Sequence, residues 1–487
     1  MMLPEAKLYI DGVMRPATGG KTYSNISPWT GETVNQAAEA SAEDVHAAIV
    51  AARRAFDTTD WSAKHEYRFE LMKRYRDLLF ANRATLVEIA RHEAGAAIGA
   101  AARAHVDGAL NGMDGLLECF PQVTWEESRG RRKDYGFESE RTVVHEPLGV
   151  VAAITPWNVP LYVNIGKVIA ALLSGCTVIL KPAPDTPTMG TYMGELAIKA
   201  GLPAGVFNVI TSSHPAMVGE MLVADPRVDL ISFTGSTAVG RRIMENGAAT
   251  LKRIFLELGG KSANIILDDA PNFAQTVMAS MVVFHAGQGC ATPTRLLVPR
   301  SRYAEAVKAL EMAYAGFATK WGDMNDPTQV MGPVISKKQL DRVMGYIELG
   351  KKEGARLLAG GQMRTDKGGG FFVEPTCFVD ARNDMRIAQE EIFGPVLVVI
   401  PFEDDEDAIR IANESEYGLG GSIISADKQR AMHVARRVRA GALSVNGGMS
   451  ITGDLPFGGF KSSGMGREWG REGIEEFLDT KVIAIRV

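Results

Sequence analysis

A cysteine between small residues is the first group in this chain whose type and setting could do chemistry. Cys290 is flanked by Gly289 and Ala291, which leave its thiol open to a reactant. The preceding Gly-Gln-Gly stretch predicts a flexible approach whose backbone amides are free to donate hydrogen bonds. The thiolate is the reacting form of cysteine, so its ordinary pKa of about 8.5 must be lowered or a base must be supplied. We interpret Cys290 as a nucleophile.

Two further residues could serve such a nucleophile. Glu257 lies in an apolar run that ends in two glycines, where an unpaired carboxylate is seldom placed for stability alone. Burial would raise its pKa toward neutrality, which suits a base, although a salt-bridged acid at a strand end is the alternative. The amide of Asn158 can donate to an oxyanion, although an asparagine in a turn is usually an Asx cap. The three residues together indicate a thiolate enzyme that forms and hydrolyses an acyl intermediate.

We expect structural roles for the other cysteines and for the nearest histidine. His285 lies five residues before Cys290, but we favour a structural role for it. We interpret Cys119, Cys176 and Cys377 as small buried hydrophobes. The four cysteines form no CxxC pair and no metal-ligand spacing, so we expect no metal site and a reducing compartment.

Short apolar runs must position these residues. The runs are four to six residues long and are separated by helical stretches with Gly or Pro punctuation. This pattern is typical of βαβ units that build a parallel sheet, and it occurs in two series that meet near residue 258. The expected strands are 150–154, 177–180, 206–210 and 230–233 in the first series, and 263–267, 295–298, 395–400 and 442–445 in the second.

The segments around these series are also patterned. Residues 41–118 are expected to be helical, because Ser41 to Asp44 is a capping signal and apolar residues then recur at helical spacing. From Lys133 to Glu146, charged residues alternate with aromatic or β-branched ones, which predicts an antiparallel excursion. The tail 481–487 alternates as a strand with no obvious partner, so we expect it to pair across subunits together with that excursion.

Length and composition limit the class of protein. A chain of 487 residues is expected to form two or three domains, and 46% hydrophobic with 23% charged residues describes a soluble globular enzyme. The net charge of -5 contains no long block of one sign, so we expect neither a nucleic-acid partner nor a membrane partner. The first residues do not resemble a signal peptide, and no run of about 18 apolar residues occurs. A cytoplasmic location is therefore expected.

The signals for a phosphate-bearing cofactor are indirect. No GxGxxG motif occurs, and the Gly-Gly-Lys-Ser stretch is not a P-loop because the first glycine of that motif is missing. The turn at Gly235 and Ser236 opens a predicted helix that could receive a pyrophosphate, although an ordinary N-cap explains it equally well. Lys181 closes a predicted strand and would point toward a ribose in the same crevice. Glu391 and Phe393 could hold a second ribose, or could simply end an acidic helix before a strand.

Together these segments resemble the NAD(P)-dependent aldehyde dehydrogenase superfamily, hydrolytic and non-CoA-acylating type, over nearly the whole chain. An ordered set of motifs is much more specific than any one of them. The matching pieces are Pro156-Trp157-Asn158, Leu180-Lys181-Pro182-Ala183, Phe233-Thr234-Gly235-Ser236, Leu256-Glu257-Leu258-Gly259-Gly260-Lys261, Gly287-Gln288-Gly289-Cys290, Glu391-Ile392-Phe393-Gly394-Pro395 and Pro456-Phe457-Gly458-Gly459-Phe460-Lys461.

This resemblance implies an α/β fold with an atypical Rossmann domain, which would explain the missing GxGxxG motif. It implies that Cys290 attacks an aldehyde to form a thiohemiacetal, whose oxyanion the Asn158 amide and the Cys290 backbone N–H stabilise. Loss of a hydride to the nicotinamide would give a thioester, which water activated by Glu257 would hydrolyse. Lys167 and Glu468 are implied to help carry the proton out.

The same resemblance implies the cofactor site. Many NAD-preferring members carry a Glu three positions after the lysine, whereas this chain has Pro184 followed by Asp185. The loss of that acid weakens the argument against NADP, so NAD is the expected cofactor and NADP stays open. The cofactor would lie along Ile154, Thr155, Pro156, Trp157, Lys181, Pro184, Phe233, Gly235, Ser236, Val239, Leu258, Gly259, Glu391 and Phe393.

The positions aligned with the family's aldehyde tunnel are mostly apolar. Gly166 falls where some relatives have a large aromatic side chain, so we expect room for a bulky apolar or aromatic aldehyde. No Arg occurs at these positions, which makes a semialdehyde acid a weaker alternative. The implied pocket residues are Val159, Tyr162, Val163, Gly166, Met449, Ser450, Ile451 and Phe457.

Three other functions stay open. A CoA-acylating relative would pass the acyl group to CoA, which the presence of Glu257 disfavours. A cofactor-independent thiol hydrolase or acyltransferase would use Cys290 without a nucleotide. A non-enzymatic descendant of the fold would need none of these residues.

The resemblance also suggests a division of the chain and its assembly as a homodimer or homotetramer. The expected parts are an NAD(P)-binding domain of residues 1–119 and 147–257 to which 454–470 returns, a catalytic domain of residues 258–453, and an oligomerisation arm of residues 120–146 and 471–487.

Overall fold

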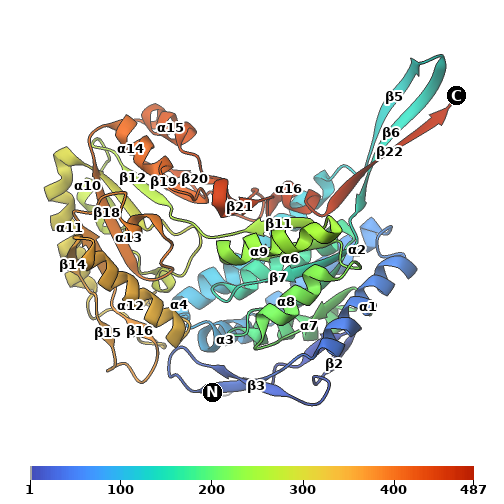
Figure 1. Ribbon diagram of the computed structural model, residues 1–487, viewed down its shortest axis with the longest axis horizontal. Coiled ribbons are helices and arrows are strands. Elements are labelled where there is room, and N and C mark those ends of the chain that lie inside the picture. Colours follow the sequence, from blue (N-terminus) through green and yellow to red (C-terminus); the bar gives the residue numbers. More distant parts are fainter. Residues whose placement is uncertain (1–2) are drawn as a thin grey trace.

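The computed structural model describes residues 3–487 as two α/β lobes with a long β arm (Figure 1). The first lobe is built on an eight-stranded sheet of order β2-β1-β9-β8-β7-β10-β11-β21. Its five central strands are parallel, and antiparallel strands close the two sides. The strands are β1 (Leu8–Ile10), β2 (Val13–Arg15), β7 (Val150–Ile154), β8 (Thr177–Lys181), β9 (Phe207–Val209), β10 (Leu230–Thr234), β11 (Arg253–Glu257) and β21 (Gly464–Met465).

Helices cover both faces of this sheet, which explains why its strands are continuous apolar runs. The first helix begins at Ser41, whose hydroxyl accepts from the Asp44 amide while the Asp44 carboxylate accepts from the Ser41 amide. A π-helical turn, 101–107, joins two later helices. The helices of this lobe are α1 (Ala42–Thr58), α2 (His65–Ala81), α3 (Arg83–Glu93), α4 (Ile98–Ala100), α5 (Gly108–Cys119), α6 (Pro160–Ser174), α7 (Pro187–Ala200), α8 (Pro215–Ala224) and α9 (Thr237–Gly247).

The second lobe is built on a seven-stranded sheet of order β14-β17-β18-β13-β12-β19-β20. The strands expected at 263–267, 295–298, 395–400 and 442–445 are present as its members β12, β13, β18 and β20. Its strands are β12 (Ala263–Ile266), β13 (Arg295–Pro299), β14 (Arg356–Ala359), β17 (Thr376–Val379), β18 (Val396–Phe402), β19 (Gly420–Ile424) and β20 (Ala442–Val445). Its helices are α10 (Phe273–Met278), α11 (Tyr303–Phe317), α12 (Lys337–Lys352), α13 (Arg386–Gln389), α14 (Asp405–Asn413) and α15 (Lys428–Arg437).

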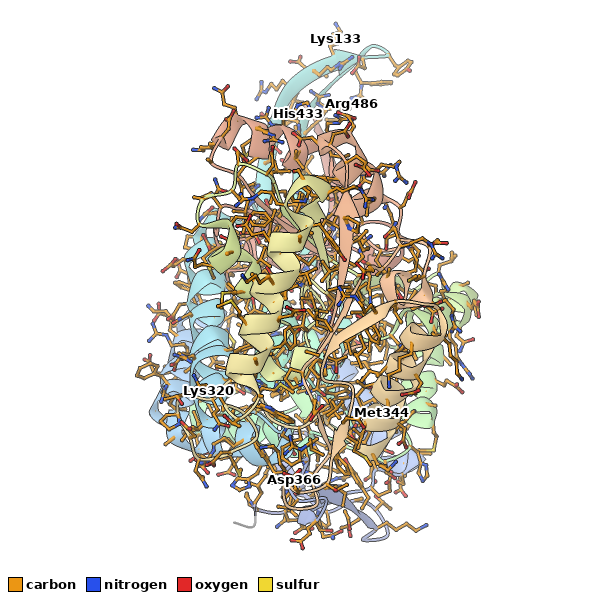
Figure 2. All side chains as sticks on the ribbon, turned by 90° about the vertical axis from the view of Figure 1, so that its left-hand side faces the viewer. Lys133, Lys320, Met344, Asp366, His433 and Arg486 are labelled. Atoms are coloured by element: carbon orange, nitrogen blue, oxygen red, sulfur yellow. The ribbon has the colours of Figure 1, made fainter. Side chains whose placement is uncertain are left out.

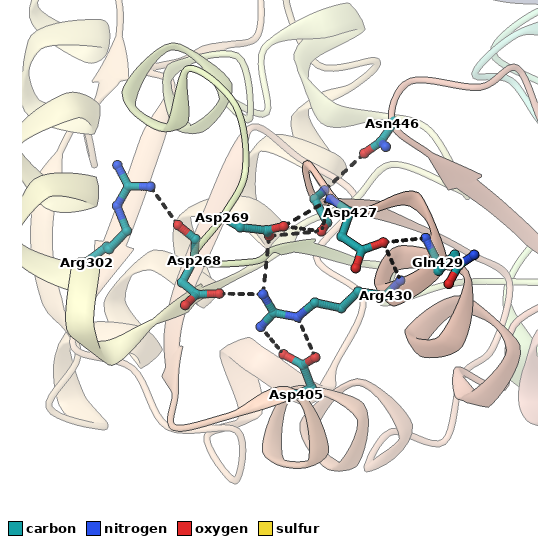
Figure 3. Close-up of polar contacts among 9 residues, drawn as sticks. Asp268, Asp269, Arg302, Asp405, Asp427, Gln429, Arg430 and Asn446 are labelled. Atoms are coloured by element: carbon teal, nitrogen blue, oxygen red, sulfur yellow. Dashed lines mark hydrogen bonds and ion pairs between the residues drawn. The ribbon is translucent and has the colours of Figure 1, made fainter.

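One arginine ties together several elements of this second lobe (Figure 3). Arg430 of α15 makes two hydrogen bonds of 2.7 and 2.6 Å to Asp405, at the start of α14. It also reaches Asp268, just after β12, at 2.7 Å. These charged hydrogen bonds fix the two helices against the end of the strand. Smaller two-stranded sheets complete the lobes, formed by β3 (Thr22–Ile26) with β4 (Thr33–Ala38) and by β15 (Met363–Arg364) with β16 (Phe372–Val373).

The arm is a three-stranded sheet of order β22-β6-β5, formed by β5 (Glu126–Asp134), β6 (Phe137–Pro147) and β22 (Leu478–Arg486). The expected antiparallel excursion is thus present, but the expectation that the tail lacks a partner of its own is wrong. β22 pairs with β6 of the same chain, from Leu478 opposite Pro147 to Arg486 opposite Ser139. Lys133 lies near the tip of the arm, which extends beyond the rest of the molecule (Figure 2).

A short segment between the lobes and the arm holds the end of β11 in place. Gly464 pairs with Glu257, and its φ of 123° lies in the region that favours glycine. A Cβ atom there would lie 2.0 Å from the Leu256 carbonyl oxygen, so no other residue fits. The buried Ser463 hydroxyl donates to the Gly259 carbonyl at 2.7 Å and accepts from the Gly418 amide at 3.0 Å, which links the two lobes.

The eight-stranded sheet takes strands from residues 8–15, 150–257 and 464–465, and the seven-stranded sheet takes strands from residues 263–445. The division of the chain into domains at residues 119, 257 and 453 stays a prediction. A helix that is long and apolar enough to cross a bilayer does not occur among residues 3–487.

Candidate active site

The carboxyl edge of the first sheet collects most of the residues that the sequence singled out. From β7 the chain proceeds through β8 and β9 to one side, whereas β10 and β11 lie on the other side. Open parallel sheets bind ligands at such a switch in strand order, beyond the carboxyl ends of the strands. Thr155 follows β7, Lys181 ends β8, Gly235 follows β10 and Glu257 ends β11. The edge therefore combines candidate cofactor groups with the candidate base.

Cys290 and Glu257 lie together, although they come from different lobes. Each of the two side chains shifts the pKa of the other. Burial raises the pKa of the Cys290 thiol, and the neighbouring charge of Glu257 raises it further. Burial also raises the pKa of Glu257 to about 8, and the charge of Glu468 adds to the rise. Both groups can therefore be neutral near pH 7, and Glu257 is the neighbouring group that can take a proton from the thiol.

Asn158 contacts the same loop as the cysteine. Its side-chain Nδ2 donates to the backbone oxygen of Gln288 at 2.9 Å, and the residue is only 4% exposed. An amide nitrogen carries two hydrogens, so one stays available to an oxyanion. The contact also fixes the direction in which this second hydrogen points.

The loop before the cysteine is rigid, which corrects the expectation of a flexible approach. Gln288 is fully buried, and its side chain donates to the carbonyl oxygens of His285 at 3.1 Å and Pro333 at 3.4 Å. Its Oε1 accepts from the amide of Ile335 at 2.9 Å. His285, Ala286 and Gly287 have φ values of 45°, 51° and 69°, so three successive residues adopt the left-handed conformation. The long polar side chain, and not glycine freedom, determines where Cys290 lies.

His285 packs inside the protein. Its ring lies 4.5 Å from the ring of His105, which belongs to the π-helical turn, and the two planes are nearly perpendicular. Burial lowers the pKa of His285 to about 4, so the imidazole is neutral at pH 7. These contacts support a structural role, as the sequence favoured.

A buried ion pair stands beside the candidate base. Lys167 of α6 is 2.5 Å from Glu468, and both side chains are almost completely excluded from water. Lys167 also donates to the Ser232 hydroxyl at 3.1 Å. The charge of Glu468 raises the pKa of Glu257, whereas the charge of Lys167 lowers it. The pair therefore acts electrostatically on the base, and its role in a proton relay stays a prediction.

The residues at the edge suit a dinucleotide. A Cβ atom on Gly259 would lie 2.5 Å from Glu391 Oε2, so only glycine permits the close approach of this acid. Glu391 Oε1 accepts from the Gly260 amide at 3.0 Å, which orients the carboxylate. The rings of Trp157 and Phe393 meet edge to face at 5.3 Å. The Thr155 hydroxyl is buried and has no hydrogen-bond partner among residues 3–487, as an atom that binds a ligand would be.

The remaining candidate cofactor residues lie on the same elements. Lys181 is 2% exposed, and burial lowers the pKa of its amine to about 8. Ser236 caps α9, accepting from the Val239 amide at 3.5 Å. The others flank the ends of β7, β8, β10 and β11, namely Ile154, Pro156, Pro184, Phe233, Gly235 and Leu258. Their contacts with a nucleotide stay predictions.

The candidate pocket residues divide into two groups. Val163 and Phe457 are buried, and Val159 and Tyr162 are half-buried. The second group forms a loop after β20, where Met449 is 76% exposed, Ile451 is 37% exposed and Ser450 is half-buried. This loop stays a predicted part of the pocket.

The space expected at Gly166 is not empty, which removes the reason for expecting a bulky substrate. A Cβ atom on Gly166 would lie 2.9 Å from Cζ2 and 3.0 Å from Cε2 of Trp469. Trp469 is fully buried and directly follows Glu468. No local pattern in the sequence links Trp469 to Gly166, because the two residues are 303 positions apart, and a large residue beside the relay acid was the only available signal. The role of Gln288 was also unpredicted, since burial of a glutamine between two glycines has no sequence signature.

This chain is similar to known proteins over nearly its whole length. The family model described as the aldehyde dehydrogenase family matches residues 14–483. The putative aldehyde dehydrogenase DhaS of Bacillus subtilis strain 168 is 38% identical over 485 residues, which cover 99% of this chain and 96% of that protein. Aldehyde dehydrogenase 1 of Tanacetum cinerariifolium is 38% identical over 480 residues, which cover 98% of this chain and 94% of that protein.

Solved structures of aldehyde dehydrogenases superpose on this chain over nearly its whole length. A betaine aldehyde dehydrogenase mutant of Staphylococcus aureus, in complex with NAD+ and with a BME-modified cysteine, superposes with a TM-score of 0.94 at 35% identity, covering 99% of this chain and 97% of that one. A mutant of aldehyde dehydrogenase C of Pseudomonas syringae, in complex with NAD+ and octanal, superposes with a TM-score of 0.91 at 38% identity, covering 98% and 96%. A cluster of three or more side chains that could hold a metal ion is absent from residues 3–487.

Replacing the candidate base should make the thiol more acidic. After burial, the charge of Glu257 is the largest cause that raises the pKa of Cys290, so Glu257→Gln should lower the pH at which alkylation by iodoacetamide is half-maximal. Mass spectrometry of the Cys290 peptide measures the rate at each pH. Buried Cys377 is the internal control and should stay unmodified. An unchanged or higher midpoint would contradict the contact between the two residues.

Proposed function

The chain belongs to the aldehyde dehydrogenase family, and from that premise we propose that it oxidises an apolar or aromatic aldehyde to its carboxylic acid with NAD+. The observation that carries the proposal is the half-buried Cys290 beside the buried Glu257, one a nucleophile and the other a base with a pKa of about 8. Asn158, held by the loop of the same cysteine, completes the set.

The cofactor would occupy the carboxyl edge of the first sheet. Lys181 and Glu391 would hold the two riboses, the start of α9 would receive the pyrophosphate, and Trp157 with Phe393 would flank the nicotinamide end. When bound, NAD+ supplies the acceptor for the hydride that leaves the aldehyde carbon. The NAD+ complexes of the two solved relatives support this choice of cofactor.

In the first half of the reaction, Glu257 takes the thiol proton and Cys290 attacks the aldehyde carbon. The negative charge that develops on the aldehyde oxygen accepts hydrogen bonds from the Asn158 amide and the Cys290 backbone N–H. Loss of hydride from the resulting thiohemiacetal leaves a thioester on the sulfur. The rigid loop around Gln288 keeps the sulfur in place through this sequence.

Before the second half, Lys167 and Glu468 carry the thiol proton away from Glu257, which returns to its carboxylate form. Glu257 then takes a proton from the water that attacks the thioester, and it gives this proton to the departing sulfur, so that the acid and the free thiol are released. A base with a pKa of about 8 is well matched to this task, because it is neither too weak to take the proton nor too strong to release it. Glu257 is thus used twice.

The apolar candidate pocket supports an apolar substrate, and the octanal complex of the Pseudomonas syringae relative agrees with it. A large free volume at Gly166 is no part of the proposal, since Trp469 occupies it. A semialdehyde acid, a CoA-acylating reaction and a cofactor-independent thiol hydrolase or acyltransferase are the competing functions. The buried base beside the cysteine favours hydrolysis over transfer to CoA.

Removing the base should trap the thioester. In Glu257→Gln the thiol loses its base but also the charge that raises its pKa, so it can still react, whereas water is no longer activated. Steady-state turnover should therefore fall by about a hundredfold to ten-thousandfold. A burst of NADH should accompany a lasting acyl adduct on Cys290, measured by intact-protein mass spectrometry. The exposed Glu472→Gln on α16 (Gly470–Glu475) is the matched control and should turn over normally. Acyl-CoA formation in the wild type on addition of CoA would instead favour the CoA-acylating reaction.

Asp185 supports NAD over NADP despite the departure at Pro184. Burial raises the pKa of Asp185, and the charges of Lys338 and Lys181 act in the opposite direction, so the acid interacts electrostatically with the proposed ribose lysine. A carboxylate there would repel a 2'-phosphate. We expect kcat/KM to favour NAD by about tenfold or more, and Asp185→Asn to reduce the ratio. A wild-type preference for NADP would sink this choice.

The arm supports assembly into a homodimer or homotetramer. β22 is the outer strand of its sheet, with one edge unpaired in the described chain, and Val482, Ile485 and Val487 expose more than half of their surface. Such an edge is stabilised by docking on another subunit. We expect sedimentation to give a multiple of 52.5 kDa, and Ile485→Asp to shift the mass toward one chain. The exposed Thr480→Asp is the control, and a monomeric wild type would refute the idea.

A further inference from the structure

Trp469 fills a slot between two helices of the first lobe. Its indole lies against Gly112 of α5, where a Cβ atom would be 2.7 Å from Cζ3, and against Gly166 of α6, where a Cβ atom would be 2.9 Å from Cζ2. Two glycines on two helices thus leave room for a single large ring. The fit is close enough that neither glycine could gain a side chain while Trp469 stays in place.

The backbone of Trp469 is held in an unfavourable conformation. Its φ of 64° and ψ of 171° lie in a region that is essentially restricted to glycine. Before it, Glu468 exchanges two backbone hydrogen bonds of 2.7 Å with Phe457, and after it the Gly470 amide donates to the Gly453 carbonyl at 3.0 Å, which fixes the segment. A bulky residue in such a conformation is kept only where the surroundings determine it strongly, and such residues cluster at functional sites.

The ring of Trp469 packs against a candidate pocket residue. The centroid of Tyr162 lies 4.5 Å from that of Trp469, with the planes tilted by 42°. Burial raises the pKa of Tyr162, and the charges of Glu468, Cys290 and Glu257 raise it further. Tyr162 and Cys290 are both half-buried and pack against the hydrophobic cluster that contains the fully buried Trp469.

We propose that Trp469 is the specificity-determining residue of the acyl pocket, because it backs Tyr162 and closes the space above Gly166. The substrate class is then an aldehyde whose acyl group is flat or unbranched next to the carbonyl, and a group branched at that carbon is excluded. This inference rests on the proposed function for its meaning as substrate choice. Trp469 and Tyr162 form an aromatic wall of the pocket. The size of Trp469 limits how far the ring of Tyr162 can move away from the substrate.

The position of Trp469 allows it to be changed selectively. Gly166 contacts Trp469 and the next residue, Lys167, pairs with Glu468, so the packing contact and the ion pair lie side by side. A smaller side chain at position 469 empties the slot but retains both members of the pair. A change in pocket width can therefore be separated from loss of the proton relay.

The test compares Trp469→Leu and Trp469→Phe with the wild type on two aldehydes. The kcat/KM for 2-phenylpropanal, which is branched beside the carbonyl, relative to that for benzaldehyde should rise about tenfold in Trp469→Leu and less in Trp469→Phe. The affinity for NAD+ should be unchanged in both. Trp61→Leu removes another buried tryptophan, 2% exposed, and should lower thermal stability without changing the ratio.

A second change tests the contact itself. Gly166→Ala should impair the wild type because the new methyl group meets the indole, and it should be tolerated in Trp469→Leu. If Trp469→Leu does not fold, the same pair of measurements in Trp469→Phe decides the question. Equal changes for both aldehydes in every folded variant would show that Trp469 is only structural and would overturn the inference.

A readout without aldehyde oxidation keeps the two proposals apart. Cys290 can be alkylated by iodoacetanilide, which is flat, and by N-tert-butyl iodoacetamide, which is branched, with rates normalised to those of free cysteine. The rate ratio of branched to flat reagent should rise in Trp469→Leu. A wild type that forms no NADH from any aldehyde would refute the proposed function, whereas an unchanged alkylation ratio would refute the role of Trp469.

Discussion

The cost of ionising a carboxyl group inside the protein is the constraint on which the site depends. Glu257 ends a buried strand, and one of its oxygens has no partner within the described chain. Such a group is kept neutral unless a charge nearby favours the ionised form. Lys167 provides that charge and Glu468 offsets it, so the base is balanced between two states. The thiol, the relay pair and the tightly packed Gly464 turn all contribute to this balance, and a site open to water would remove it.

The sequence was informative wherever a local pattern determines the structure. Continuous apolar runs with Gly or Pro between them predicted the parallel strands, and strand ends then located Lys181, Gly235 and Glu257 at one edge. The sequence was uninformative where packing depends on a distant residue. Gly166 indicated free space only if nothing else filled it, and the side chain that fills it is contributed by Trp469 from another part of the chain. The spacing of apolar residues does not reveal that Trp469 fills the space beside Gly166, because each of the two residues is compatible with its own local segment.

The loop that holds the reacting sulfur is fixed by the buried Gln288 side chain, although its glycine content alone would predict a flexible loop. Three consecutive left-handed residues, 285–287, would be mobile if nothing else held them, yet the buried Gln288 amide bonds to the loop itself and to a neighbouring segment. The strain is therefore offset by one polar side chain. Trp469 also has a strained backbone, and there the buried indole holds the segment in place of an amide. In both places a strained backbone is fixed by a large, fully packed side chain, which keeps reacting groups in position without reorganisation.

The ion pair between Lys167 and Glu468 joins residues 301 positions apart. Closing a loop of that size costs chain entropy, which the contacts of the docked segment must outweigh. The segment with Gly464, Glu468 and Trp469 pairs with β11 and packs on α6, so its native contacts exist only where both elements are formed. A chain that lacks these contacts has the cysteine but neither the tuned base nor the closed aromatic wall. The reactivity of Cys290 therefore depends on the joining of segments that are far apart in the sequence.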